Sequence, residues 1–105
     1  MAKKVIIETL EKYIALLKAE GIAVNKAFLY GSYSSDTETD DSDIDLMIVT
    51  NNTDADNDFI VGKIWKLTRK INTKIEPFLV GLKRFNENNY SPLIDSVKKN
   101  GIQII

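Results

Sequence analysis

Acidic residues crowd one short segment of the sequence, where six of them occupy the ten positions from Asp36 to Asp45. The last two, Asp43 and Asp45, alternate with Ile44 and Leu46 at the start of the β-rich run DIDLMIVT. Side chains in a strand alternate between its faces, so this spacing predicts both carboxylates on one face and the apolar residues on the other. Two close carboxylates repel each other, whereas a divalent cation would be held by them. The pair is therefore a candidate metal site.

Glu76 is a candidate third ligand on a neighbouring strand. It interrupts the second β-rich run KIEPFLVG and is predicted to share a face with Lys74 and Phe78. Three carboxylates on adjacent strands would make an oxygen-only site suited to Mg²⁺ or Mn²⁺, the kind used in phosphoryl and nucleotidyl transfer. Two other interpretations of Glu76 stay open, a solvent-facing strand residue or an ion pair with Lys74 or another cation.

A glycine and a serine, Gly31 and Ser32, follow directly on the apolar run FLY. Glycine lets a backbone approach a phosphate closely, and serine adds a hydroxyl donor. A Gly-Ser pair alone is typical of a simple turn. The spacing makes this pair a more specific signal, because ten residues separate it from the Asp-x-Asp pair on the next predicted strand.

Two simpler explanations of the acidic segment are a solvated loop and a calcium site. An EF-hand loop starting at Asp36 would need glycine at its sixth position and glutamate at its twelfth, where the chain has Asp41 and Met47. The second acidic string, DADND, would place Phe59 and Trp65 there. The spacing excludes an EF-hand in both segments, and a solvated loop stays open.

Composition narrows the class of protein. With 105 residues, we expect a single domain comprising residues 1–105. The chain has no histidine and no cysteine, so carboxylates, hydroxyls, lysines or a hard metal must carry any catalysis. A net charge of −1 argues against binding to duplex nucleic acid. Glu8 and Glu11 interrupt the N-terminal apolar segment, and no run approaches the roughly 20 apolar residues of a membrane span. We therefore expect a cytoplasmic protein without membrane contact.

Hydrophobic periodicity and turn residues predict four strands and three helices. The predicted helices cover residues 3–20, 56–71 and the segment from Pro92 to Asn100; the predicted strands cover 24–30, 43–50, 74–81 and the closing IQII. Pro77 cannot donate to a sheet ladder, which favours an edge strand or a bulge. The order predicts an α/β (α+β) fold, a small mixed sheet of about four strands with helices packed on it.

The segment GSYSSDTETDDSDIDL resembles the signature of the DNA polymerase beta-like nucleotidyltransferase superfamily, namely Gly-Ser, ten residues and Asp-x-Asp. It is most similar to the minimal nucleotidyltransferases, the MNT proteins, which include antitoxins of the HEPN–MNT type. The similarity extends over nearly the whole chain, because the leading helix, the acid-bearing strand and the ending SPLIDSVKKNGIQII also follow the pattern. It implies a nucleotidyltransferase fold like the palm of polymerase beta.

The resemblance implies a role for each candidate residue. Gly31 and Ser32 would hold the β- and γ-phosphates of a nucleoside triphosphate. Asp43 and Asp45 would bind two Mg²⁺ ions, with Mn²⁺ as an alternative. Glu76 would complete one metal site and help to deprotonate an acceptor hydroxyl, which would attack the α-phosphate as pyrophosphate leaves. ATP would be the donor substrate and AMP the transferred group.

The resemblance also implies a partner. Larger relatives carry a second domain that holds the acceptor, and this chain has no length left to build one. The implied partner is a HEPN-domain protein, an all-helical ribonuclease toxin, and the MNT protein would act as its antitoxin by transferring AMP to a tyrosine. The alternative is a non-catalytic binding subunit with the same fold, which would neutralise the partner without turnover.

One position departs from the pattern of these relatives, many of which carry a glycine where this chain has Asp36. Aspartate tolerates a left-handed turn better than most residues, so we expect the loop to keep its shape. The four acids Asp36, Glu38, Asp40 and Asp41 would repel a triphosphate unless they point away from it.

Basic residues line one side of the helix predicted over 56–71, where Lys63, Lys66, Arg69 and Lys70 occur together. A solvated face is the simplest interpretation, and a contact with nucleotide phosphates or with an acidic partner is the alternative. Phe59 and Trp65 lie on the same helix, and we expect them in the core or at an interface.

Overall fold

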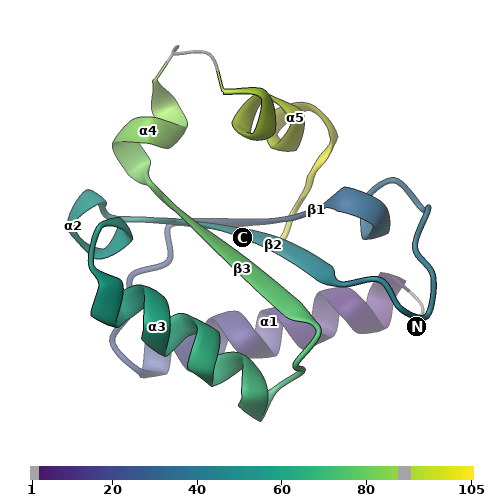
Figure 1. Cartoon of the computed structure of the whole chain (residues 1–105), viewed down its shortest axis with the longest axis horizontal. Coiled ribbons are helices and arrows are strands. Elements are labelled where there is room, and N and C mark those ends of the chain that lie inside the picture. The colour runs from purple at the N-terminus through teal and green to yellow at the C-terminus, as the bar shows by residue number, and fades with distance from the viewer. Residues whose placement is uncertain (1–2, 88–90) are drawn as a thin grey trace.

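A computed structural model describes residues 3–87 and 91–105. Figure 1 shows a sheet with helices on both of its faces. The elements in chain order are α1 (Lys3–Ala19), β1 (Lys26–Tyr30), the 3₁₀ turn η1 (Gly31–Tyr33), β2 (Ile44–Thr50), α2 (Asn52–Ala55), α3 (Asp58–Leu67), the 3₁₀ turn η2 (Thr68–Lys70), β3 (Ile75–Gly81), α4 (Leu82–Asn86), α5 (Pro92–Asn100) and β4 (Ile102–Gln103).

The four strands form one mixed sheet in the order β3-β2-β1-β4. β1 is antiparallel to both β2 and β4, whereas β2 and β3 run parallel. Pro77 lies on β3, which is an edge strand, as expected of a residue that cannot donate to the ladder. The predicted mixed sheet with packed helices is confirmed.

Each face of the sheet has its own apolar core. Ile44, Leu46 and Ile48 of β2 belong to the core that α1 and α3 cover, while Met47 and Val49 belong to the core under α4 and α5. The two pairs of helices lie on opposite sides of the sheet (Figure 1). β2 is therefore buried on both faces over most of its length, and its polar side chains must lie at its ends.

Local sequence signals fix where the helices begin and end. The Asn57 side chain accepts hydrogen bonds from the backbone of Phe59 and Ile60, so α3 starts at Asp58 and not at residue 56. Ser91 caps α5 with Pro92 at its start, as predicted. Gly21, with a φ of +83°, follows the last turn of α1.

Three details differ from the sequence-based expectation. The polar segment 51–54 contains a short helix, α2, because the Asn51 side chain accepts from the backbone of Asp54. The short helix α4 follows β3 directly and was not predicted. The last turn of the helix expected to reach Ile71 is a 3₁₀ turn, which commonly ends α-helices.

Two aromatic side chains of α3 do not enter the core. Phe59 is 77% exposed and Trp65 is 46% exposed, so the core placement that the sequence left open for them is wrong. Ile64 and Leu67 supply the buried side of the helix. Among the described residues, none of the helices has the length and apolar character to cross a membrane.

Candidate active site

Strand register brings the candidate residues of β2 and β3 together at one end of the sheet. Asp45 is the direct partner of Glu76 on one side and of Tyr30 on the other. Asp43 lies just before β2, two residues ahead of Asp45. Asp45 is half-buried, while Asp43 and Glu76 are exposed. The three candidate carboxylates thus lie at the open end of the face whose interior α4 and α5 cover.

These carboxylates perturb one another. Burial raises the pKa of Asp45 above its ordinary value, and the charge of Asp43 raises it further. The pKa of Glu76 is also raised, first by desolvation, then by the hydrogen bond that protonated Glu76 donates to Asp43, and then by the charges of Asp43 and Asp45. A cluster that resists ionisation in this way would gain from a divalent cation.

Tyr30 extends the site on the β1 side. Burial raises the pKa of its phenol, and the charges of Asp45 and Glu76 raise it further. Asp45 acts from the adjacent strand β2 and Glu76 from β3 beyond it, so Tyr30 belongs to the same electrostatic unit. No pattern in the sequence singles out this residue, because only the strand register places it beside Asp45.

Gly31 meets the acidic cluster directly. Its φ is +74°, which L side chains rarely adopt, and a β-carbon there would lie 2.2 Å from Oδ2 of Asp45. No real β-carbon approaches an oxygen so closely, so the position requires glycine for two independent reasons. The backbone of η1 and the Asp45 carboxylate are consequently in contact.

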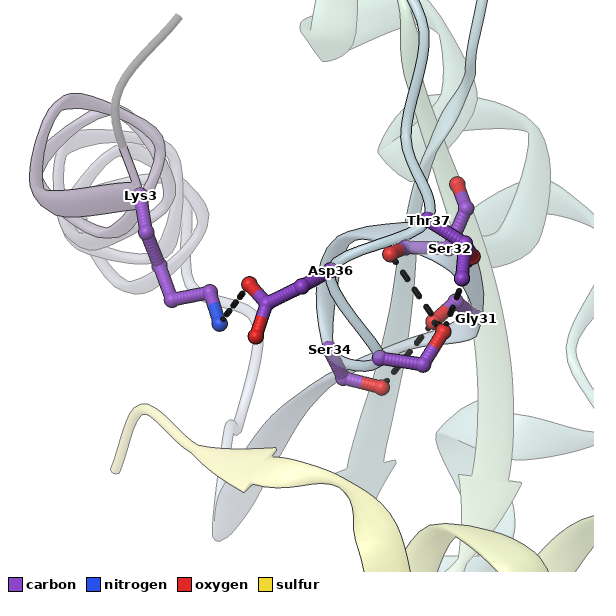
Figure 2. Close-up of polar contacts among 7 residues, drawn as sticks. Lys3, Gly31, Ser32, Ser34, Asp36 and Thr37 are labelled. Carbon is purple, nitrogen blue, oxygen red and sulfur yellow. Dashed lines mark hydrogen bonds and ion pairs between the residues drawn. The ribbon is translucent and has the colours of Figure 1, made fainter.

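The turn after Gly31 is tightly organised, as Figure 2 shows. The Gly31 carbonyl accepts hydrogen bonds from the Ser34 and Ser35 hydroxyls at 3.0 and 3.1 Å, and the Ser32 carbonyl accepts from the Thr37 backbone at 2.9 Å. Within the described residues, the Ser32 hydroxyl has no hydrogen-bond partner. A groove of about 420 Å³ lies beside the turn, and Ser96 and Asn100 of α5 form its other wall.

Asp36 keeps the loop in shape and carries its charge away from the turn. Its φ is +58°, so an aspartate occupies the left-handed conformation as predicted. Its carboxylate forms an ion pair with Lys3 of α1 at 2.6 Å, on the side of the loop away from Gly31 (Figure 2). Further along, the Lys74 ammonium donates to the Asp40 carbonyl. Lys74 therefore bonds the loop backbone.

The sequence and the fold agree on the family. The family model described as "Polymerase beta, Nucleotidyltransferase" matches residues 6–105. The chain belongs to the polymerase beta nucleotidyltransferase family. No curated protein sequence matches it. In this nucleotidyltransferase-family chain, the acidic end of the sheet is the candidate active site.

Solved structures share the fold of this family member. A toxin–antitoxin complex with AMP-PNP is 21% identical with a TM-score of 0.66, over 90% of this chain and 71% of that chain. A mutant of the MntA–HpeT toxin–antitoxin is 18% identical with a TM-score of 0.60, over 100% and 73%. A candidate nucleotidyltransferase from Sulfolobus solfataricus is 16% identical with a TM-score of 0.56, over 96% and 77%. At these identities the likeness shows the fold.

The donor set of the candidate site suits a hard divalent cation, because all of its ligand atoms are carboxylate oxygens. Within residues 3–87 and 91–105, however, no group of three metal-binding side chains already converges on one point. The three-ligand site therefore stays a prediction.

Proposed function

We propose that this chain is a Mg²⁺-dependent nucleotidyltransferase that transfers AMP from ATP to a hydroxyl group of a partner protein, with residues 1–105 acting as one minimal domain. The observation that carries the proposal is the contact between the Gly31 backbone and the Asp45 carboxylate. It joins a phosphate-sized backbone turn to an acidic cluster in a chain that belongs to a nucleotidyltransferase family.

Gly31 and Ser32 would receive the β- and γ-phosphates. The Asp45 carboxylate occupies the position that a β-carbon of residue 31 would take, so a phosphate held by this turn would lie next to the acidic cluster. The Ser32 hydroxyl is available as a donor, because it makes no hydrogen bond within the described residues. The groove between η1 and α5 offers space for the rest of the nucleotide. Asp36, held by Lys3, would not oppose the triphosphate.

Asp43, Asp45 and Glu76 would hold the two Mg²⁺ ions, for which Mn²⁺ could substitute. When bound, the ions would supply charge neutralisation for the α-phosphate and for the leaving pyrophosphate. Ionised Asp45 carries a free-energy cost without a cation, first from burial and then from the charge of Asp43, as its raised pKa indicates. A bound cation would relieve this cost, so the ionised cluster is more favourable with a cation than without one.

Glu76 would take the proton of the acceptor hydroxyl. It is exposed at the edge strand β3, where an acceptor from another molecule could reach it. As the proton moves to Glu76, the acceptor oxygen forms a bond to the α-phosphorus and the bond from that phosphorus to pyrophosphate breaks. The products are an adenylylated partner and pyrophosphate.

The partner would be a toxin, a HEPN-domain protein as the sequence resemblance implies, with this chain as its antitoxin. Two structural neighbours are toxin–antitoxin complexes, one of them solved with AMP-PNP. The other carries two Asp-to-Glu changes that are two positions apart, which is the spacing of Asp43 and Asp45. These points support the proposal for this chain.

The test is co-expression with the protein encoded next to it, followed by mass spectrometry of that protein. The proposal expects a mass increase of one adenylyl group, lost in Asp43→Asn and Asp45→Asn, and kept in the control Asp56→Asn outside the cluster. If the partner is neutralised equally by the wild type and by both variants without any mass change, the alternative of a non-catalytic binding subunit holds.

A further inference from the structure

The outer side of α3 is hollowed and partly apolar. This helix lies on the face of the sheet opposite α4 and α5 (Figure 1). A groove of about 710 Å³ runs along α3 and η2, with Phe59, Gly62 and Lys66 among its lining residues. A second hollow of about 420 Å³ adjoins it at Gly62 and Lys66 and is lined by Trp65. We call these two hollows together the α3 groove.

Gly62 has no role in packing this chain. It lies inside α3, where glycine is roughly 1 kcal/mol less favourable than alanine, and a β-carbon there would have nothing within 4 Å. Gly31, in contrast, is required by both its φ and its neighbour. An unneeded glycine inside an exposed helix leaves a notch, which lets a foreign backbone come close. Packing among the described residues does not require this glycine.

Exposed aromatic side chains flank this notch. Phe59, three residues before Gly62, is 77% exposed, and Trp65, three residues after it, is 46% exposed. Large aromatic side chains at the surface are typical anchors of protein interfaces. Phe59, Gly62 and Trp65 are three residues apart along α3, so they form a row against which a short helix could lie.

The charge of the α3 groove is positive although the chain as a whole carries −1. Lys63 forms an ion pair with Glu20, which directly follows α1, at 3.6 Å. Lys66, Arg69 and Lys70 have no ion-pair or hydrogen-bond partner among the described residues. Three free cations beside two exposed aromatic rings complement an acidic surface that also carries apolar side chains.

We propose that the α3 groove binds an acidic amphipathic helix of a partner protein. The apolar side of that helix would lie on Phe59, Gly62 and Trp65, and its carboxylates would meet Lys66, Arg69 and Lys70. The proposal goes beyond nucleotidyl transfer, because the α3 groove and the acidic cluster lie on opposite faces of the sheet. Four basic residues outnumber Glu20 and Asp58 in the lining, so the groove favours an acidic ligand, and the exposed rings of Phe59 and Trp65 suit the apolar side of a protein helix.

Trp65 provides the readout, because it is the only tryptophan in the sequence. The probe is a synthetic helical peptide with leucines on one side and glutamates on the other. Two further probes test the alternatives: the same peptide with lysine in place of glutamate, and a single-stranded oligo-dT. We expect a saturable change of Trp65 fluorescence with the acidic peptide alone. A saturable change with the lysine peptide or with oligo-dT, or none with the acidic peptide, would overturn the proposal.

Two variants separate binding from folding. Gly62→Ala should raise the melting temperature, because the helix gains propensity, and should weaken peptide binding about tenfold by filling the notch. Lys66→Glu should weaken binding about tenfold or more, while the charge-matched control Lys12→Glu, on the exposed side of α1, should bind like the wild type. Unchanged affinity in Gly62→Ala, or a melting temperature below that of the wild type, would contradict the assignment.

Discussion

Gly31 and Asp45 are in direct contact across two antiparallel strands, so that a β-carbon at position 31 would come within 2.2 Å of the Asp45 carboxylate. The turn proposed to receive phosphates and the carboxylate proposed to bind metal are thus in contact. A side chain at position 31 would displace the Asp45 carboxylate.

Replacing Gly31 by alanine should disrupt the site and the fold together. The left-handed φ of +74° costs an L residue roughly 1–2 kcal/mol, and the collision with Asp45 adds to it. We expect a lower melting temperature and loss of ATP binding. Gly21→Ala is the matched control, since Gly21 has a φ of +83° but open space around it. It should lose stability by the backbone effect alone and should keep ATP binding; equal loss of binding in both variants would refute the contact argument.

Neutralising Asp45 should stabilise the metal-free protein at neutral pH. Burial and Asp43 raise the pKa of Asp45, so its protonated form is favoured in the folded state. The stability from this group is full below its ordinary pKa of 3.8 and is lost as the pH rises through the raised value. Asp45→Asn should therefore melt at a higher temperature than wild type at pH 7, and the difference should vanish below that ordinary pKa.

A pair of controls accompanies the pH measurement. Glu76→Gln should show the same sign with a smaller effect, because Glu76 is exposed and solvent screens its charge. Glu11→Gln, on the exposed side of α1, should change the melting temperature little at either pH. A destabilised Asp45→Asn at pH 7 without metal would show that the carboxylate is not under repulsion.

Position 36 separates backbone shape from charge. Asp36 has a φ of +58° and an ion pair with Lys3 at 2.6 Å, with its side chain 74% exposed. Asp36→Asn should cost less than about 1 kcal/mol, because exposed ion pairs contribute little. Asp36→Ala should cost about 1–2 kcal/mol through its left-handed backbone, and Asp36→Gly should cost the least. Urea unfolding of the three variants would measure this order, and a more stable alanine than glycine variant would refute it.

The Tyr13 hydroxyl should matter to stability and not to nucleotide binding. It donates a hydrogen bond of 2.7 Å to the Ile64 carbonyl and so joins α1 to α3 inside the core. Tyr13→Phe would leave that carbonyl without its partner, at a cost of about 1–3 kcal/mol. Urea unfolding should show this loss while calorimetry shows unchanged ATP affinity. Reduced affinity would mean that the core and the site are coupled.

Much of the site could be predicted because its signals are local. Acidic and apolar residues alternate from Asp43 to Leu46, and this alternation predicted which face of the strand each side chain takes. Leu46 is indeed fully buried. The proline of KIEPFLVG indicated the edge strand. Each of these signals needs only the geometry of one strand.

The missing parts depend on partners that lie far away in the sequence. Tyr30 joins the acidic cluster only through its register with Asp45. Ser96 and Asn100 reach the groove beside Gly31 only because α5 returns over the sheet. The exposure of Phe59 and Trp65 follows from the angle at which α3 packs, which helical spacing alone does not determine.

The most direct test of the account is calorimetric titration of ATP into the wild-type chain and Asp45→Asn, each with and without Mg²⁺. The account predicts saturable binding by the wild type only when Mg²⁺ is present, and no binding by the variant under either condition. Binding that is equal with and without the metal, or equal in the wild type and Asp45→Asn, would contradict the assignment of the acidic cluster as the nucleotide and metal site.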